Sequence, residues 1–316
     1  MTVVRGAFAP LLVPGARKVF VDDYNELPAD YPMVFNVETS TKAFEDDLVM
    51  AGLPIAVFKP EGEEIAFDRP VFRGKVRYLH AGYGLGYEIT QEAVEDDQYA
   101  ALNSQGATNL ARSVREAESV SAWNILNNSF TSVTTYDGQP LVSATHTGIG
   151  GLTFANTPAA PEDLSTAALK SATERFFNMQ NDRGLRVSLM AKNLIVPVGN
   201  WWIAQEILGT QVVLGSFGNV SAPDATSETG SITSNDAKNV VTMMGLMPMK
   251  SPYLTDQDAW WLTADKSQHK MNFFWRRTPQ DVSGDDLRAG LAWFGITARW
   301  STGATDWRGV DGSEGV

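Results

Sequence analysis

The residue types that most often perform chemistry are few in this chain and lie far apart. There are three histidines, His80, His146 and His269, and no cysteine. A Ser-His-Asp site would need an activated serine, yet no G-x-S-x-G motif occurs, and the G-S-F-G at 215–218 lacks that spacing. Without cysteine, thiolate metal sites, cysteine nucleophiles and disulfides are excluded. We therefore interpret the histidines as packing or surface residues and expect no catalytic site.

Two further patterns could hold a phosphate or a metal ion. Gly82, Gly84 and Gly86 resemble a phosphate-cradling loop, but the third glycine comes too early for G-x-G-x-x-G, and there is no G-K-[ST]. They instead predict a glycine-rich joint between a strand and a helix. Paired acids occur without the D-x-D-x-D-G order of a calcium loop, at Asp22-Asp23, Asp46-Asp47, Asp96-Asp97 and Asp285-Asp286. Solvated faces or ion pairs between subunits explain these acids, and we expect neither a metal site nor a cofactor.

Length and composition describe a chain that can bury a core. With 316 residues, 43% of them hydrophobic, it is long enough for about two domains or one elongated body. The 37 acidic and 25 basic residues give a net charge of −12, a poor match for a protein that binds nucleic acid through its phosphates. An acidic wall that only encloses nucleic acid is compatible with that charge.

The sequence gives no sign of membrane insertion. No window is apolar enough for a membrane helix, and Pro10 and Pro14 interrupt the apolar N-terminus. We therefore expect no membrane partner and no cleaved signal, and we expect the chain to be made and used in a cytoplasm.

The first eighty residues predict segments that bury little within one subunit. Residues 1–40 contain four prolines, which favours an extended arm, and their apolar side chains suggest that the arm lies on another surface. Strand-like runs at Leu53–Lys59 and Ile65–Tyr78 flank the turn sequence Pro60–Glu64, and apolar and basic residues alternate in the second run. Because a two-stranded ribbon is only marginally stable alone, this ribbon needs a partner surface.

A long helix is predicted from about 90 to 128. Thr90 can cap it, and acidic residues in its first turns suit the helix dipole. Ala107, Leu110 and Val114 then recur at helical spacing. At 1.5 Å per residue, such a helix would span roughly 58 Å and act as a strut across the body.

The remainder mixes helices with strands. Helices are predicted at about 160–182 and 201–208, and strands at 187–196, 239–249, 258–264, 268–277 and 286–300. Residues 215–238 are rich in Gly, Ser, Thr, Asn and Asp, which predicts a long exposed loop. In the last strand, the face with Phe294 and Trp300 and the face with Leu291 and Trp293 are both apolar, so we expect both to be buried.

Short strings stand in a fixed order along nearly the whole chain. They are F-N-V-E-T-S-T-K-A-F-E-D-D (35–47), K-P-E-G-E-E-I-A-F-D (59–68), Y-G-L-G-Y-E-I-T-Q-E-A-V-E-D-D (83–97), G-Q-P-L-V-S-A-T-H (138–146), L-I-V-P (194–197) and D-W-R-G-V-D-G-S (306–313). In this order and spacing they resemble the major capsid proteins of tailed bacteriophages, most closely the Mu-like head-subunit group. Each string is weak alone, and their order makes the resemblance specific.

The resemblance implies an α+β fold with four parts. These are an N-terminal arm (1–40), an extended β-hairpin loop with its flanks (41–82), a peripheral domain that contains the long spine helix (83–150), and a mainly axial domain (151–265). Return strands and a C-terminal segment (266–316) complete the peripheral domain. In the family, arm and hairpin lie across neighbouring subunits, and axial domains meet at the centres of hexamers and pentamers.

The function that the resemblance implies is assembly rather than chemistry. The chain would be a non-enzymatic major head protein that encloses the double-stranded DNA genome in an icosahedral shell, within a virion assembled in the host cytoplasm. Expected partners are copies of itself, a portal protein, decoration proteins and a scaffolding protein, which is expected to be separate because only an arm precedes the hairpin. Two alternatives stay open: an encapsulin-like compartment shares the fold, and a soluble α/β hydrolytic enzyme is disfavoured by the missing nucleophile motif.

Contacts between subunits are predicted at the hairpin and at the start of the spine helix. The basic return strand of the hairpin and the acidic helix start have opposite charges, so we expect them to meet across adjacent subunits. The predicted contact residues are Lys59, Glu61, Glu63, Arg69, Arg73, Lys75, Arg77, Glu92, Glu95, Asp96 and Asp97. Some family members join subunits by a Lys–Asn isopeptide bond. Lys59 and Lys75 lie in the right region, but residue type alone does not predict that bond.

Overall fold

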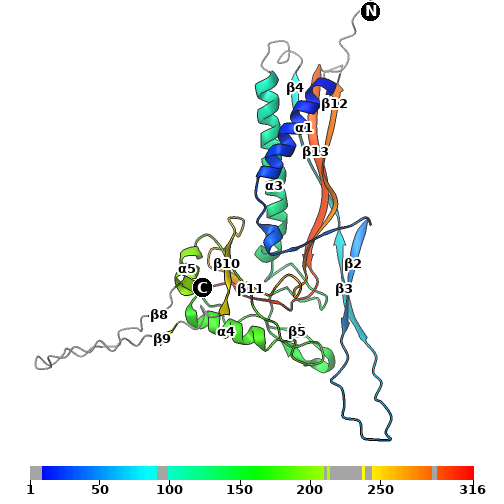
Figure 1. Ribbon diagram of the computed structural model, residues 1–316, viewed down its shortest axis with the longest axis vertical. Helices are drawn as coiled ribbons and strands as arrows, with labels where there is room; N and C mark the ends of the chain where they lie inside the picture. The colour runs from blue at the N-terminus through cyan, green and yellow to red at the C-terminus, as the bar shows by residue number, and fades with distance from the viewer. Residues whose placement is uncertain (1–8, 91–98, 210–211, 214–236, 239–243, 287–289) are drawn as a thin grey trace, which may run out of the picture.

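The fold is built on one long helix and a long, narrow sheet that packs against it (Figure 1). The computed structural model describes residues 9–90, 99–209, 212–213, 237–238, 244–286 and 290–316. Helix α3 (Tyr99–Asn127) runs along a four-stranded sheet, whose order is β1-β12-β13-β4. The strands are β1 (Asn36–Thr39), β12 (Met271–Asp286), β13 (Leu291–Ala304) and β4 (Ala81–Thr90). β1 pairs with β12 in parallel, and the other neighbours are antiparallel.

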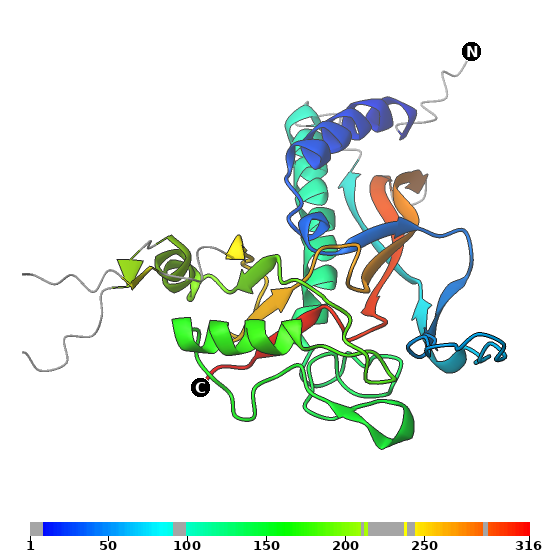
Figure 2. The ribbon, with the colours of Figure 1, turned by 60° about the horizontal axis from the view of Figure 1, so that its bottom comes forward.

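A second helix, α1 (Ala9–Glu26), lies beside α3 (Figures 1 and 2). Ala16 and Phe20 are buried one helical turn apart and pack with Leu110 of α3 and with Phe294 and Ile296 of β13. This i, i+4 stripe is the pattern that lets an amphipathic helix cover a core. The two helices therefore cover one face of the sheet, and we call the opposite face the outer face.

The second body of the chain contains a smaller sheet with the order β10-β7-β11-β14. Its strands are β10 (Met247–Lys250), β7 (Asn193–Val196), β11 (Trp260–Thr263) and β14 (Val310–Ser313), accompanied by helices α4 (Thr166–Phe177) and α5 (Trp201–Gly209). Trp260 and Trp261 are buried in the core that this sheet shares with the end of α3. Short elements complete the described chain: η1 (Tyr31–Met33), η2 (Ile149–Gly151), β5 (His146–Thr147), β6 (Thr153–Phe154), β8 (Val212–Val213) and β9 (Ala237–Lys238).

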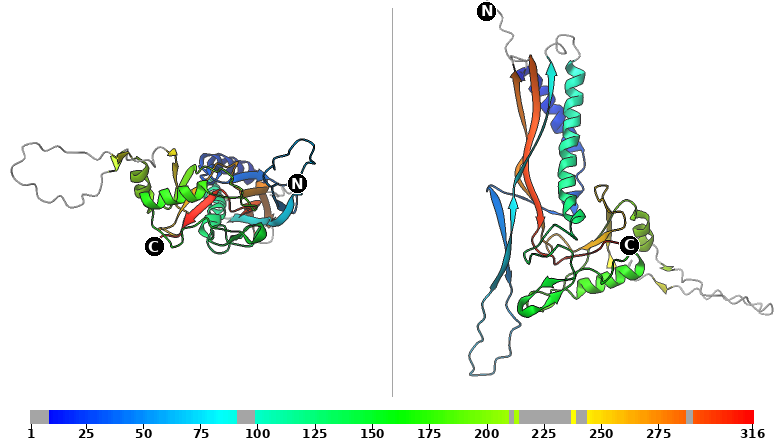
Figure 3. Two further views of the ribbon diagram at one scale, coloured as in Figure 1. Left: turned by 90° about the horizontal axis from the view of Figure 1, so that it is seen from below. Right: turned by 180° about the vertical axis from the view of Figure 1, so that it is seen from behind.

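A β-hairpin projects from the junction of the two bodies (Figures 1 and 3). Its legs, β2 (Phe44–Ala51) and β3 (Val71–Leu79), form an antiparallel pair. Residues 52–70, which we call the hairpin tip, connect the legs without strand pairing. The sequence placed the strands at Leu53–Lys59 and Ile65–Tyr78, which is wrong for the tip. Pro54, Pro60 and Pro70 remove ladder donors there, and pairing begins only where the legs reach the body.

The prediction of an extended chain over residues 1–40 is wrong for α1. Pro10 lies in its first turn, where a missing N–H is tolerated, and Pro14 follows at the start of the next turn. The buried stripe at Ala16 and Phe20 stabilises the helix through tertiary packing. The spacing of Ala16, Phe20 and Tyr24 was the signal for this helix, and the prolines obscured it.

Other predictions fare differently. α5, β11 and the body of α3 lie where expected. Thr90, the predicted cap of the long helix, is instead the last residue of strand β4. Residues 91–98, which include the acids of the predicted helix start, lie outside the described residues. α4 is shorter than predicted and begins after Ser165, whose hydroxyl accepts a hydrogen bond from the Ala168 N–H at 3.1 Å. The strand expected at 187–196 narrows to β7, and the one at 268–277 continues to Asp286. The loop expected at 215–238 lies almost wholly outside the described residues. Among the described helices, none is long and apolar enough to cross a membrane.

One structural expectation needs correction: Gly82, Gly84 and Gly86 lie within strand β4, not in a joint that leads into a helix. The core face of β13 is buried, and its outer face is partly covered, with Trp293 39% exposed and Leu291, Thr297 and Arg299 half-buried. β14 pairs with β11 in the smaller sheet. The peripheral and axial domain boundaries themselves stay predictions.

One glycine fixes how closely the hairpin approaches the body. A Cβ at Gly74 would lie 2.4 Å from the Tyr136 carbonyl oxygen, whereas a Cβ at Gly52, in the same hairpin, would have nothing within 4 Å. We expect Gly74→Ala to lower the free energy of unfolding of the unassembled subunit by about 1–3 kcal/mol through overpacking. Gly52→Ala should leave it unchanged or raise it slightly, by about 0.4–1 kcal/mol. Urea unfolding of both variants checks this; equal values for the two would contradict it.

Candidate assembly surface

The hairpin tip exposes apolar side chains that no other part of the described subunit covers. Phe58 is 87% exposed and Phe67 is 93% exposed. Further exposed apolar residues along the hairpin are Leu48, Met50, Leu53, Ile55, Val57, Ile65, Phe72 and Leu79. Soluble monomers seldom expose apolar patches of such extent, and a patch of this kind marks a surface that another molecule covers.

The hairpin root is fastened to the body by buried polar contacts. Tyr78, at the end of β3, is 2% exposed, and its hydroxyl lies 2.6 Å from Thr305 Oγ1. The Thr305 hydroxyl in turn donates to Asp47 Oδ2 of β2 at 2.8 Å. Both legs of the hairpin are thus tied to the segment that follows β13, which fixes the direction in which the tip projects.

Arg73 joins the hairpin to the smaller body. It is the unpaired residue of a β-bulge between Gly74 and Phe72, and its Nη2 donates to the Thr147 carbonyl oxygen at 2.7 Å. Its Nε lies 3.4 Å from Asp182 Oδ1, a carboxylate that also accepts from Tyr136 Oη and Arg308 Nη2 at 2.8 and 3.1 Å. Bulges redirect side chains, and this one aims Arg73 into a buried cluster. Sequence reasoning missed Asp182, Tyr136 and Arg308 because they are distant in the chain.

The other basic residues of β3 are also engaged within the subunit. Arg77 forms a bidentate pair with Asp46 of β2, at 2.6 and 2.7 Å, and Lys75 Nζ lies 3.3 Å from the same carboxylate. The hydrogen bonds from Arg77 and Lys75 outweigh desolvation and lower the pKa of Asp46 to about 2. Within one subunit these cross-strand ion pairs stabilise the pairing of β2 and β3.

The predicted contact residues therefore fall into three groups. Arg73, Lys75 and Arg77 have carboxylate partners in their own subunit, and Lys59, Glu61, Glu63 and Arg69 lie exposed on the tip. The acids of the predicted helix start, Glu92, Glu95, Asp96 and Asp97, lie outside the described residues. The contact of β3 with a neighbouring helix start stays a prediction.

The three histidines are buried rather than gathered into a catalytic site. His80 bonds Ser40 Oγ with Nε2 at 3.2 Å and Ser301 Oγ with Nδ1 at 3.0 Å, so no carboxylate orients the ring as a Ser-His-Asp triad requires. His146 lies 2.9 Å from Asp137 and stacks on Trp307. Burial lowers the pKa of His269 to about 4. Across the described part of the chain, no three His, Asp or Glu side chains are placed to hold a metal ion.

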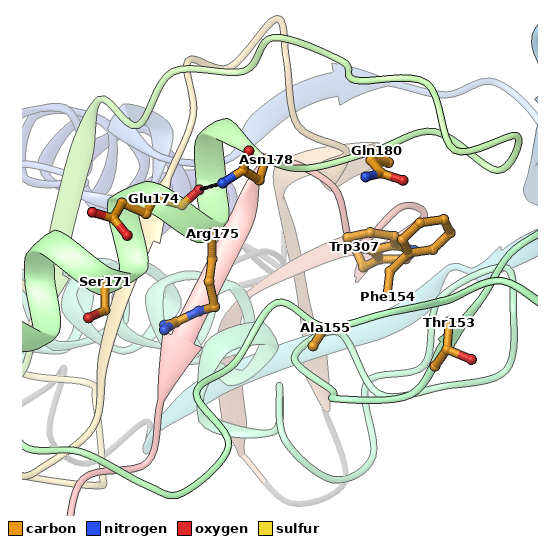
Figure 4. Close-up of a pocket in the computed structure, with 9 residues that line it drawn as sticks. All are labelled: Thr153, Phe154, Ala155, Ser171, Glu174, Arg175, Asn178, Gln180 and Trp307. Carbon is orange, nitrogen blue, oxygen red and sulfur yellow. Dashed lines mark hydrogen bonds between the residues drawn. The ribbon is translucent and has the colours of Figure 1, made fainter.

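A groove of about 520 Å³ lies between α4 and the β6 segment (Figure 4). Ser171, Glu174 and Arg175 of α4 line one side, and Phe154 and Trp307 lie on the other (Figure 4). The guanidinium group of Arg175 does not stand free, because it pairs with both oxygens of Asp311 on β14, at 3.1 and 2.8 Å. The Arg175–Asp311 pair thus ties α4 to the end of the chain instead of forming a reactive centre.

Helix α1 is held to α3 by a buried acid. Glu118 is fully buried; it accepts from the Tyr24 hydroxyl at 2.5 Å and from Arg115 Nη1 at 2.8 Å. Arg115 also donates from Nη2 to the Tyr24 carbonyl oxygen and lies over the Tyr24 ring. Burial raises the pKa of Glu118, and the hydrogen bond from Tyr24 and the charge of Arg115 oppose that shift.

Solved structures with this architecture are shells. The capsid of a GTA particle has 11% sequence identity and a TM-score of 0.54, with 90% of this chain and 88% of that chain covered. The capsid of bacteriophage JBD30 decorated with minor capsid protein trimers has 13% identity and a TM-score of 0.53, with 72% and 92% covered. A virus-like particle from Pyrococcus furiosus has 9% identity and a TM-score of 0.50, with 95% and 98% covered. The helix, sheet and hairpin therefore form the fold of phage major capsid proteins.

The sequence itself identifies the family. A family model described as phage capsid protein matches residues 76–310, which is most of the chain. The chain belongs to this phage capsid protein family, and it is a structural protein of the virion. Comparison with curated protein sequences finds no match. The Mu-like subgroup stays a prediction.

The exposed phenylalanines of the tip give a test of its role. We expect Phe58→Ser combined with Phe67→Ser to change the free energy of unfolding of the unassembled subunit by less than about 0.5 kcal/mol, because both side chains are exposed. Association between subunits should weaken more than tenfold, since burial of one phenylalanine contributes about 1.5–3 kcal/mol. Val316→Ser, an equally exposed apolar residue away from the hairpin, is the control. Sedimentation velocity measures association; undiminished association of the double variant would contradict the prediction.

The Arg175–Asp311 pair gives a pH test of stability. Burial raises the pKa of Asp311 to about 7, against the opposing effect of Arg175. The folded state then holds a proton between about pH 4 and 7 that the unfolded state has lost, so this group's contribution to stability falls as pH rises, by at most about 1.4 kcal/mol per pH unit. We expect Asp311→Asn to remove that slope from the pH profile of the urea-unfolding free energy. A profile parallel to that of the wild type would contradict the assignment.

Proposed function

We propose that this chain is the major head protein of a tailed bacteriophage, which self-assembles into hexamers and pentamers of an icosahedral shell around double-stranded DNA. The observation that carries the proposal is the hairpin tip, whose apolar side chains find no cover within the described subunit. A fixed root aims this tip away from the body (Figures 1 and 3), toward where a neighbour would lie. The shell would form in the host cytoplasm and remain as the virion head.

The mechanism that we propose is multivalent. Each subunit would place its hairpin on one neighbour while its own surface receives the hairpin of another, which is the head-to-tail contact that closes into rings. Each contact is modest, but it joins subunits that other contacts already hold close together, so the shell is far more stable than any one interface. The net charge of −12 suits a wall that encloses DNA without adhering to it.

The proposed partners follow from this role. A portal protein and a scaffolding protein would direct assembly, and decoration proteins would occupy the finished surface, as minor capsid protein trimers do on the JBD30 capsid. We propose no catalytic activity, and the contacts of His80, His146 and the Arg175–Asp311 pair support this, because each connects structural elements.

A compartment that stores protein cargo, of the encapsulin-like kind, is the alternative. The virus-like particle from Pyrococcus furiosus, 98% of whose chain is covered, is a particle with this fold that is not named as a phage capsid. The family match to phage capsid proteins favours the phage head. The contents of shells isolated from the native source separate the two: DNA indicates a head, and a single abundant protein indicates a compartment.

Expression of the full chain tests the proposal directly. We expect light scattering after size-exclusion chromatography to give hexamers, pentamers or megadalton particles rather than the 34.4 kDa subunit, with shells visible by electron microscopy. The Phe58→Ser, Phe67→Ser variant should remain unassembled. A chain that stays a compact monomer, with and without its scaffolding protein, would refute the proposed function.

A further inference from the structure

His146 is a fully buried ring with an oxygen atom facing each of its two nitrogens. Its Nδ1 lies 2.9 Å from Asp137 Oδ2, and its Nε2 lies 3.2 Å from Asn156 Oδ1. A neutral imidazole has one N–H and one lone pair, so it can donate to only one of these oxygens. The protonation of the ring therefore depends on whether both oxygens must accept a hydrogen bond.

The first oxygen belongs to Asp137, a carboxylate with no exposed side-chain surface. Burial by itself would raise the pKa of Asp137, but hydrogen bonds from His146 and Thr135 outweigh it and lower that pKa to about 2. The carboxylate also accepts from the backbone N–H groups of Gln139 and Thr147, at 3.1 and 3.2 Å. An ionised carboxylate has no proton to give, so the hydrogen that joins it to His146 belongs to Nδ1.

The second oxygen belongs to the Asn156 amide, whose orientation is fixed by three other hydrogen bonds. Its Nδ2 donates to the carbonyl oxygens of Leu141 and Val310 at 2.8 and 3.0 Å, and its Oδ1 accepts from the Ser143 N–H at 2.8 Å. Carbonyl oxygens only accept, so the amide nitrogen must face them and the amide oxygen must face His146. The hydrogen between the two side chains therefore belongs to His146 Nε2.

The aromatic neighbour of the ring also suits a positive charge. His146 stacks on Trp307 with ring centres 4.5 Å apart, and an aromatic face attracts a cation. A second cation, Arg308, lies over the same Trp307 ring at 4.6 Å, but its charge is balanced by Asp306 and Asp182. Strand β6, which pairs with His146, contains no charged side chain.

The contact between Asp137 and His146 closes a loop on which the hairpin rests. It joins the two ends of residues 137–146, a stretch with no other charged side chain. Directly outside those ends, the Tyr136 carbonyl oxygen lies against Gly74 of β3, and the Thr147 carbonyl oxygen accepts from Arg73 Nη2 at 2.7 Å. Separation of the two side chains would therefore loosen both supports of β3 at once.

We propose that His146 is an imidazolium in the folded subunit, and that its ion pair with Asp137 is a pH-sensitive latch that holds the hairpin in one direction. Loss of one proton would leave a lone pair facing either the Asp137 carboxylate or the Asn156 oxygen, which is a buried repulsive contact. The loop at 137–146 would then open, and the hairpin would lose its fixed direction. The latch acts within one subunit, so it holds whether or not the chain forms a shell.

Nitrogen NMR of the full-length, unassembled subunit tests the charge. The chain has three histidines, and the signals of His146 are those that disappear in His146→Gln or, if that variant does not fold, those that change in Asp137→Asn. At neutral pH we expect a hydrogen on both ring nitrogens, seen as a one-bond coupling at each. Asp137→Asn should leave only one, because an amide does not stabilise the second charge. A single protonated nitrogen in the wild type would overturn the proposal.

Amide hydrogen exchange, compared at one pH, tests the closure of the loop. The Thr147 N–H donates to Asp137, so we expect it to exchange at least about tenfold faster in Asp137→Asn than in the wild type. The Leu169 N–H of α4 should exchange at the same rate in both, which separates local opening from a loss of overall stability. The control variant Asp265→Asn removes the same charge from an exposed ion pair with Lys192 and should leave Thr147 unchanged.

Spin labels test whether the latch sets the direction of the hairpin. Because the chain has no cysteine, labels attach only at introduced ones, Met50→Cys on β2 and Glu206→Cys on α5. With no further change we expect one narrow distribution of label distances at neutral pH. The distribution should broaden in Asp137→Asn, and also without that change once the pH is raised until His146 loses a proton. A distribution that stays narrow under both conditions would overturn the latch.

Discussion

The constraint on which this structure depends is that one subunit cannot cover its own hairpin. A two-stranded ribbon is marginal by itself, and a tip lined with apolar side chains is unfavourable in water. The hairpin root nevertheless has a fixed position on the body. Tyr78 and Asp47 both form hydrogen bonds with the Thr305 hydroxyl, and Gly74 lies close to the backbone of Tyr136. In the proposed shell, a rigid root would direct the tip toward a neighbour in one direction, so that less conformational entropy is lost when the contact forms.

Buried charges lie at the joints between elements that are distant in the sequence. Asp182 forms ion pairs with Arg73 of the hairpin and with Arg308 of the segment before β14. Glu118 accepts a hydrogen bond from Tyr24 of α1, and Asp311 forms an ion pair with Arg175 of α4. A buried ion pair adds little net stability compared with apolar packing, but breaking one leaves a charge that cannot be solvated. Such a joint therefore tolerates one arrangement of its elements, and a shell of repeated subunits requires that every copy present its surfaces at the same angles.

The sequence predicted the elements whose pattern is local. Apolar residues at helical spacing located α3, and the alternation at Phe294 to Trp300 identified the core face of β13. It failed where tertiary packing overrides local preference: the core contacts of Ala16 and Phe20 hold α1 in a helix despite its prolines. It also failed for contacts between distant residues, because nothing near Arg73 in the chain indicates that Asp182 is its partner.

The outer face of β13 is only partly covered within the subunit, and this bears on function. Tyr78 of the hairpin root packs on Phe274 and Gly303 there, whereas β4 contributes glycines opposite Gly295, Thr297 and Arg299, and Trp293 is 39% exposed. A sequence records which surfaces are buried in the working assembly, not only in the isolated chain. The partly covered outer face and the uncovered tip are then one kind of feature, since each leaves apolar surface in water in a single subunit and would be covered in the proposed shell. This coupling of local cost to contact between copies favours assembly over an idle monomer.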